Sequence, residues 1–306
     1  MKTNLTSSLL SFATIAVLAL SGCNSNTTST DDNSTLPHDE AVSDALIAEQ
    51  REALATSLDG TEGAQSPRDI DTLTGSNTKP TTTAPASTAM NLCNIHFHKG
   101  TEHKGGEFTK YAGNGDGKGY GTGYEYSGTL SEAELATYTI ADDHNPLYSG
   151  DTIEVHYVYS SDDITPGATL GACLAEGREA GTQPLLRVET QVYVLVNDGH
   201  GLDFENLNEV SGDGSADTFY QASNIPSNTG TPVEYEGSTT GPGYNEKVSP
   251  LQVSWSVRPN IAKVNIKTVE DWFHHDGGDR FDEHHAHAVR NLVTNPALLS
   301  DMTSGD

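Results

Sequence analysis

The chain has 306 residues, and its 43 acidic against 16 basic side chains give a formal net charge of −27. A protein this acidic repels nucleic acid and anionic lipid surfaces, so neither is expected to be its binding partner. The composition suits a body exposed to salty or extracellular water, and it does not by itself identify a substrate.

The first residues have the organisation of an export signal. A short basic start precedes an apolar run over residues 9–20, which is too short for a membrane-spanning helix. The stretch Leu20-Ser21-Gly22-Cys23 resembles the lipobox of bacterial lipoproteins. That resemblance implies a signal peptide over residues 1–22, a lipid anchor on Cys23, and a place in the bacterial envelope, with the outer membrane favoured. The alternative is an ordinary secretory signal with an incidental cysteine.

Residues 23–90 are expected to precede the folded domain. Asn, Ser, Thr and Asp dominate residues 24–36, so a disordered tether should follow Cys23. Apolar side chains near helical spacing predict one helix over residues 39–58. Residues 61–90 are rich in Ser, Thr, Pro and Gly, and this composition indicates a linker.

The remaining residues, 91–306, are expected to form one mainly β domain. Its apolar run over residues 185–197 is typical of a central strand buried on both faces. Gly and Tyr dominate residues 111–128, which indicates an ordered insertion, and short helices are expected at 131–137 and 282–293. Strand-like runs separated by turn residues occur at 92–98, 151–159, 185–197, 231–236, 251–258 and 261–267.

Three histidines on two of these strands form a candidate metal site. His96 and His98 alternate with Ile95 and Phe97, so both imidazoles face one side of their strand. His156 lies on the second strand. Three neutral imidazoles can hold Zn²⁺ and leave the fourth tetrahedral position open to water, which suggests hydration chemistry. The alternative is a polar sheet face that contacts solvent and binds nothing.

Two further side chains lie on the same faces as these histidines. Asn94 precedes His96 by two residues, and Glu154 precedes His156 by two. Metal-bound histidines usually donate their second N–H to a carboxylate or carbonyl oxygen, so Asn94 and Glu154 are candidate supports for the ligands.

The histidine-rich run over residues 274–287 could bind a metal as well. We favour a different interpretation, a helix start capped by Asp282 with His285 or His287 packed locally.

Four short motifs, in order, resemble those of alpha-class carbonic anhydrases. They are the His-Phe-His strand at 94–98, the Glu-x-His strand at 154–158, the Gly-Ser-x-Thr segment at 235–242 and the Val-x-Trp strand at 253–257. The overall spacing, the Gly/Tyr insertion and the C-terminal histidines are more similar to the delta class. The resemblance covers about residues 90–295. It implies a single α/β body built on a central, mostly antiparallel sheet with few short helices.

The resemblance also implies reversible hydration of CO₂ to bicarbonate by zinc-bound hydroxide. His96, His98 and His156 would be the zinc ligands. Thr239 would orient the hydroxide, and Thr240 would line the bicarbonate site. CO₂ and bicarbonate would be the small-molecule partners.

The adjacent residues Glu102 and His103 are similar to a family pair whose glutamate fixes the proton of that threonine. A histidine with a pKa near 6.5 is the natural group to carry the product proton to solvent. His103, His144 and His200 are the candidates for this role.

The cysteine count predicts one disulfide. Once Cys23 is assigned to the lipid, Cys93 and Cys173 remain, and an even pair in an exported protein usually forms a bridge. Two buried free thiols are the alternative.

Two other functions remain open at this point. His96-x-His98-x₃-Glu102, with His156 as a later histidine, matches the centre of a cupin motif, in which Glu102 would bind iron or manganese. The chain could also be a surface lipoprotein that binds zinc without catalysis. Its oligomeric state is not predicted.

Overall fold

The computed structural model describes residues 41–60, 62–72, 74–143, 145–175, 183–240 and 245–301. The expected signal peptide, Cys23, the tether and His144 lie outside the described residues. No helix in this described part is both long enough and apolar enough to cross a membrane.

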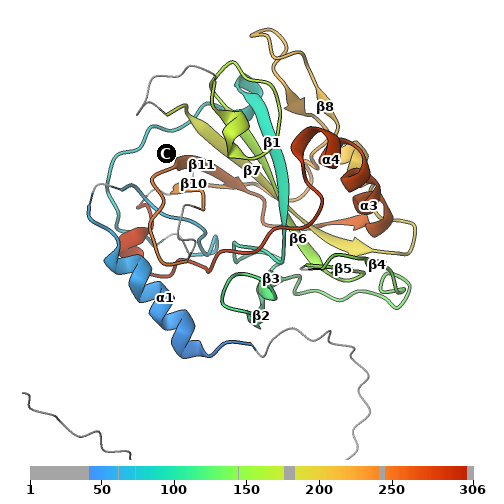
Figure 1. Ribbon diagram of the computed structural model, residues 1–306, viewed down its shortest axis with the longest axis horizontal. Coiled ribbons are helices and arrows are strands. Elements are labelled where there is room, and N and C mark those ends of the chain that lie inside the picture. Colours follow the sequence, from blue (N-terminus) through green and yellow to red (C-terminus); the bar gives the residue numbers. More distant parts are fainter. Residues whose placement is uncertain are drawn as a thin grey trace, which may run out of the picture. The chain divides into compact units, whose positions relative to one another are not determined.

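A six-stranded mixed sheet forms the centre of the protein (Figure 1). Its strand order is β1-β6-β7-β11-β10, and β12 also pairs with β7. The pairs β1–β6, β6–β7 and β10–β11 are antiparallel, whereas β11 and β12 run parallel to β7. The expected mainly β body on a mostly antiparallel sheet is confirmed. The strands are β1 (Asn91–Lys99), β6 (Thr152–Ser160), β7 (Leu186–Val196), β10 (Val233–Ser238), β11 (Gln252–Val257) and β12 (Ala262–Asn265).

Smaller elements surround this sheet. Three two-stranded hairpins are formed by β2 (Lys110–Asn114) with β3 (Thr122–Glu125), β4 (Thr139–Ile140) with β5 (Leu147–Tyr148), and β8 (Val210–Ser211) with β9 (Gln221–Ala222). The α-helices are α1 (Asp44–Thr56), α2 (Phe204–Leu207), α3 (Ile266–His274) and α4 (Asp276–Phe281), and 3₁₀ turns occur at Ser87–Ala89, Leu170–Cys173 and Pro296–Leu298. The helices are few and short, as expected.

Strand alternation divides the central sheet into a packed face and a face that carries the histidines. Every residue of β6 and β7 is buried, and both strands are rich in the β-branched and aromatic residues that favour strands. On one face, Phe97 and Tyr157 belong to the core that contains Trp272 and Phe273 of α3. His156 alternates with Tyr157, so its imidazole faces the other side.

Three expected elements are wrong or partly wrong. Residues 131–137 form turns rather than a helix. The strand expected at 261–267 ends at Asn265, whose side chain accepts a hydrogen bond from the Lys267 N–H and caps α3.

Residues 282–293 form no helix. β1 is an edge strand of the central sheet, and it pairs with this segment through hydrogen bonds from His287 N to Phe97 O and from Lys99 N to His287 O. An edge strand offers unpaired backbone groups, and here they hold the C-terminal segment in an extended conformation.

The segment expected to be a linker packs into the body. Gln65 and Arg68 are fully buried, and Ser66 is 2% exposed. The Gln65 N–H donates to the carbonyl of Leu298, and the Ile70 N–H donates to that of Lys104. Its Ser/Thr/Pro-rich composition was misleading because several of these polar groups make buried hydrogen bonds instead of contacting solvent. The folded body therefore begins well before residue 91.

A disulfide joins Cys93 of β1 to Cys173, with an S–S distance of 2.02 Å. The predicted pairing is confirmed. Because Cys173 ends the 3₁₀ turn Leu170–Cys173, the bridge attaches this turn to the strand that carries His96 and His98.

Candidate metal centre and active site

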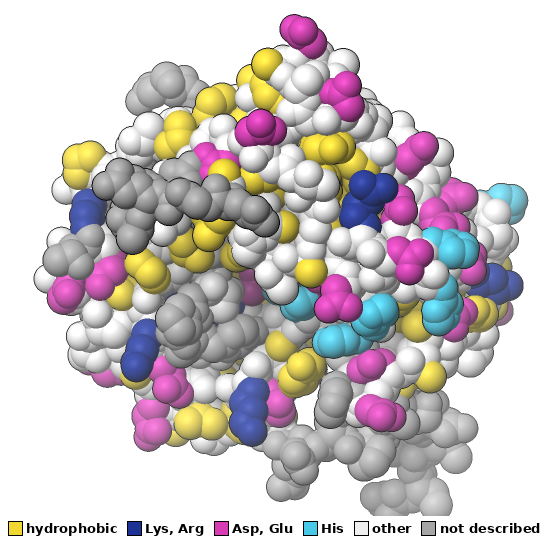
Figure 2. All heavy atoms as spheres, turned by 45° about the horizontal axis from the view of Figure 1, so that its top comes forward, with side chains coloured by type: hydrophobic (Ala, Val, Ile, Leu, Met, Phe, Trp, Pro, Cys, Tyr) yellow, Lys and Arg dark blue, Asp and Glu magenta, His cyan; other side chains and the backbone are white. Residues whose placement is uncertain are grey.

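A pocket of about 380 Å³ opens on the histidine-bearing face of the sheet. Figure 2 shows histidine and acidic side chains gathered together on one face of the molecule. The polar lining includes Asn94, His96, His98, Glu102, His156, Thr239, Thr240, Glu283, His285 and His287. The apolar lining includes Val158, Leu170, Val188 and Trp255. The pocket thus combines a cluster of imidazoles with an apolar wall.

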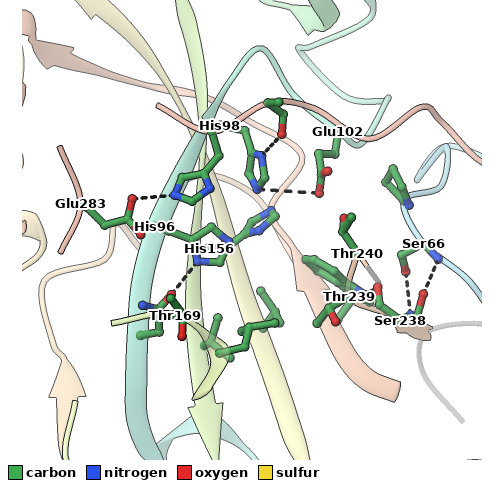
Figure 3. Close-up of a pocket in the computed structure, with 18 of the residues that line it drawn as sticks. Ser66, His96, His98, Glu102, His156, Thr169, Ser238, Thr239, Thr240 and Glu283 are labelled. Carbon is green, nitrogen blue, oxygen red and sulfur yellow. Dashed lines mark hydrogen bonds and ion pairs between the residues drawn. The ribbon is translucent and has the colours of Figure 1, made fainter. Parts of the chain in front are cut away.

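The three predicted ligands converge at the floor of this pocket (Figure 3). His96 of β1 lies directly opposite His156 of β6 in the antiparallel pair. The ring centroids are 5.4 Å apart for His96 and His98, 5.1 Å for His96 and His156, and 4.8 Å for His98 and His156. One ring nitrogen from each histidine lies within 4.8 Å of the others, so the three could bind one ion.

Oxygen acceptors fix the orientation of the two β1 histidines. His96 Nδ1 lies 2.6 Å from Asn94 Oδ1, and His98 Nδ1 lies 2.7 Å from the carbonyl oxygen of Ala288. Each Nδ1 therefore carries the proton and donates it, which leaves each Nε2 as a lone pair for a metal. The expected role of Asn94 as a support for His96 agrees with this geometry.

A buried carboxylate lies beside the third ligand. Glu154 is fully buried, and its Oε1 lies 3.6 Å from His156 Nε2 and 2.5 Å from His103 Nδ1. Burial alone would raise the pKa of Glu154, but the neighbouring His103 and His156 hold it well below its ordinary value. The carboxylate therefore stays charged and lies beside His156 Nε2, although 3.6 Å is longer than a hydrogen bond.

Burial also favours the neutral form of the two β1 imidazoles, since it lowers the pKa of both His96 and His98. It lowers the pKa of His98 to about 4, although Glu102 acts in the opposite direction. Burial and the neighbouring imidazoles lower the pKa of His96 well below its usual value. Neutral imidazole is the form that binds metals, so this site suits a divalent cation at neutral pH.

Glu102 and Thr239 line the same pocket as predicted, on one side of the histidines (Figure 3). Glu102 Oε1 accepts a hydrogen bond of 2.8 Å from the Arg290 N–H, and its Oε2 lies 3.9 Å from His98 Nε2. Thr239 Oγ1 is buried and finds no hydrogen-bond partner among the described residues. Because Thr239 lines the pocket, this hydroxyl is available to a ligand or a water molecule there. Thr240 lines the pocket beside it.

The structure describes two of the three histidines proposed for proton transfer, His103 and His200, and neither lines the pocket. His103 is fully buried, with its Nδ1 at Glu154 and its Nε2 only 2.6 Å from Tyr235 Oη, so it cannot exchange protons with solvent. His200 is not among the residues that line the pocket. The burial of His103 argues against a role as shuttle, and its Nδ1 contacts Glu154 instead.

Two pocket histidines were missed by the sequence interpretation. His285 is exposed, His287 is half-buried, and their rings stack with centroids 5.9 Å apart. Glu283 Oε2 lies 2.6 Å from His287 Nε2 and raises the pKa of His287, although burial acts against this. The signal that could have found them is the spacing of 283, 285 and 287, which places three side chains on one side of an extended segment.

Together, three converging histidines on an antiparallel strand pair and an adjacent apolar wall make up the candidate active site of a metalloenzyme. A model of the family described as "Delta carbonic anhydrase" matches residues 87–268, which is more than half of the chain. The chain therefore belongs to the delta carbonic anhydrase family, as the sequence motifs suggested. No curated protein sequence matches it.

Several solved structures are similar to this chain. The alpha-carbonic anhydrase of Thermovibrio ammonificans, solved with sulfanilamide, is 13% identical, with 73% of this chain and 83% of that chain covered and a TM-score of 0.30. The alpha-carbonic anhydrase of Photobacterium profundum is 14% identical, with coverages of 80% and 93% and a TM-score of 0.25. A hyperthermostable carbonic anhydrase from a hydrothermal vent chimney is 13% identical, covers 76% and 87%, and has a TM-score of 0.28.

The family decides against both alternative functions. A cupin site would need Glu102 as a fourth ligand, but the pocket group whose ligand atoms lie within 4.8 Å of one another consists of His96, His98 and His156. The protein is an enzyme of the carbonic anhydrase family, so the hypothesis of a non-catalytic zinc-binding lipoprotein is wrong.

Proposed function

We propose that this protein hydrates CO₂ reversibly to bicarbonate and a proton, with Zn²⁺ held by His96, His98 and His156. The proposal rests on the placement of the three rings. One nitrogen of each ring lies close to a nitrogen of the other two, and the second nitrogen of each ring faces an oxygen atom of Asn94, Ala288 or Glu154. When bound, zinc would act as a Lewis acid that lowers the pKa of a water molecule to about 7, the value known for carbonic anhydrase itself.

The apolar wall suits a small molecule without charge. Val158 of β6 and Val188 of β7 are direct partners across the sheet, and Trp255 of β11 pairs with Val188. These side chains exclude water from one side of the pocket and offer CO₂ a place beside the histidines. Leu170 extends this wall from the turn held by the disulfide.

Thr239 is the side chain best placed to orient the attacking oxygen. Its N–H is already used in a 3.1 Å hydrogen bond to the carbonyl of Leu251, so only its hydroxyl is available to the pocket. A hydroxyl that accepts a hydrogen bond from the attacking oxygen directs a lone pair of that oxygen toward CO₂. The acceptor for the hydroxyl proton would be Glu102, which lines the same pocket.

The product proton must leave through the mouth of the pocket. Glu283 already holds His287, whereas the exposed ring of His285 stacks on His287 and faces solvent. His285 is therefore the group that we expect to pass the proton to buffer.

Replacing His285 with alanine should lower kcat roughly 10-fold or more in weak buffer and leave kcat/KM unchanged, since proton transfer to solvent follows the chemical step. Stopped-flow assays at low and high imidazole concentration measure this, and added imidazole should restore kcat. His275→Ala, outside the pocket, is the matched control. A kcat that stays at the wild-type level in weak buffer would remove His285 from the pathway.

Direct measurement of CO₂ hydration tests the proposed function. The zinc-loaded protein should accelerate hydration in a stopped-flow assay, removal of the metal with a chelator should abolish the acceleration, and stoichiometric zinc should restore it. Zinc-loaded protein that leaves the hydration rate at its uncatalysed value would disprove the function.

We further propose that the enzyme is exported and anchored in the bacterial envelope by lipid on Cys23, at the periplasmic face or the cell surface. The export signal and the cysteine that follows it support this location. Membrane fractionation of cells that express the wild type or Cys23→Ala tests it. Retention of the variant in the membrane would contradict lipidation.

A further inference from the structure

We infer that Gln65 and Ser66 are positioning residues for the part of the pocket lining formed by Ser238 and Thr239, here called the Thr239 wall. We also infer that the Ser66 hydroxyl connects this wall to the proposed ligand His156. The inference rests on the proposed function, because it concerns how Thr239 is placed for the reaction. Both residues lie before residues 87–268, the part matched by the family, so the match assigns them no role.

Reciprocal hydrogen bonds attach this segment to Ser238, the residue before Thr239 (Figure 3). The Ser66 N–H donates to Ser238 Oγ at 3.3 Å, and the Ser238 N–H donates to Ser66 Oγ at 3.2 Å. Gln65 Oε1 accepts from Ser238 Oγ at 3.1 Å and from the Ser249 N–H at 2.7 Å. Gln65 therefore bridges Ser238, at the end of β10, and Ser249, which precedes β11.

The neighbouring glycine allows this close approach. A Cβ added to Gly237 would lie 2.0 Å from Ser66 Oγ, and 2.9 Å and 3.0 Å from ring atoms of Tyr235 and Trp255. Any side chain at position 237 would therefore displace the Ser66 hydroxyl from its hydrogen bonds. This requirement gives a physical reason for the glycine in the Gly-Ser-x-Thr motif.

The same hydroxyl begins a buried chain of polar contacts that ends at a metal ligand. Ser66 Oγ lies 3.0 Å from Tyr235 Oη, which lies 2.6 Å from His103 Nε2. His103 Nδ1 lies 2.5 Å from Glu154 Oε1, and that oxygen lies 3.6 Å from His156 Nε2. All five side chains are at most 3% exposed, so water does not compete for these contacts.

This arrangement locates Thr239 relative to the histidines. The hydroxyl of Thr239 has no partner of its own in the described structure, so its position depends on the backbone that Ser66 and Gln65 hold. Ser66 contacts both that backbone and the chain that supports His156. The hydrogen bonds of Ser66 and Gln65 to Ser238 and Ser249 are here called the clamp. A displacement of about 1 Å at a reacting group can cost roughly 100-fold in rate, so loss of the clamp should reduce catalysis even though all three proposed metal ligands remain.

The test compares Ser66→Ala and Gly237→Ala with the wild type in the full, zinc-loaded chain. Both should increase amide hydrogen exchange in a peptide that contains Ser238, because the Ser238 N–H loses its acceptor. Both should lower kcat/KM for CO₂ roughly 10- to 100-fold while zinc content stays at the wild-type value.

Thr229→Val is the matched control. It also removes a buried hydroxyl, which donates a 2.6 Å hydrogen bond to Gln191 Oε1, but Thr229 does not line the pocket. The control should lower the melting temperature and leave kcat/KM and exchange at Ser238 unchanged.

The inference is overturned if exchange at Ser238 does not rise in Ser66→Ala, or if exchange rises and kcat/KM stays at the wild-type value. It is also overturned if Thr229→Val reduces kcat/KM equally, since the effect would then be general destabilisation. A zinc-loaded wild type that does not hydrate CO₂ would disprove the proposed function, and the exchange data would still decide whether the clamp holds Ser238.

Discussion

Substitution of His156 with alanine is expected to abolish stoichiometric zinc binding and CO₂ hydration together. The ring is 3% exposed and would supply one of the three proposed ligands, so its loss would leave two imidazoles and an incomplete tetrahedron. Loss of a residue that merely supports a ligand typically costs 10- to 100-fold in metal affinity, and loss of a ligand should cost more than about 100-fold. Metal analysis after dialysis and stopped-flow hydration measure both effects.

His275→Ala provides the control for this experiment. His275 is an exposed histidine at the end of α3, where it contacts Glu205 at 2.5 Å and does not line the pocket. This variant should retain one zinc per chain and wild-type activity. If His156→Ala still holds zinc at wild-type affinity, the zinc resides elsewhere, with the C-terminal histidines as the first alternative, and the proposed centre is wrong.

Substitution of Thr239 with valine is expected to lower kcat/KM by roughly 100- to 1,000-fold, the usual cost of removing one hydrogen-bonding group that acts in the transition state. Valine keeps the shape of threonine, so the metal site and the fold should remain intact. Zinc content and the circular dichroism spectrum should match the wild type. The measurement is stopped-flow hydration at saturating zinc.

Thr239→Ser retains the hydroxyl and should keep most of the activity, which separates the role of the hydroxyl from that of the methyl group. Wild-type kcat/KM in Thr239→Val would show that its unpartnered hydroxyl plays no part in the reaction. The orientation of the attacking oxygen would then require another group, and Glu102, which lines the same pocket, would be tested next.

Local spacing was enough to place two of the proposed ligands, His96 and His98, on one face of their strand. His96 and His98 share a face because alternate residues of a strand point to the same side, and this holds whatever lies next to the strand. The meeting of His96 with His156 could not be read in the same way. It depends on the register of β1 against β6, which places these two residues directly opposite each other. The sequence suggested that the two strands are neighbours, and the structure gives their register.

Two segments near the pocket differ from what their local sequence pattern predicted. Residues 282–293 were expected to be helical, but the unpaired edge of β1 binds this segment in an extended form and brings His287 into the pocket. Residues 61–90 were expected to be a linker because Ser, Thr and Pro are common in exposed segments. Composition cannot show that Ser66 has buried partners, since those partners lie elsewhere in the chain.

The amino-acid sequence by itself determined the class of the enzyme, the strands that carry its ligands and the residue types at the centre. Side-chain direction within one strand depends on neighbours one or two residues away, which the sequence displays directly. The tertiary structure decided which ring nitrogens remain free, which histidines line the mouth and which residues hold the Thr239 wall. Those features arise from contacts such as that between Ser66 and Ser238, 172 residues apart, which form only when the whole chain has packed.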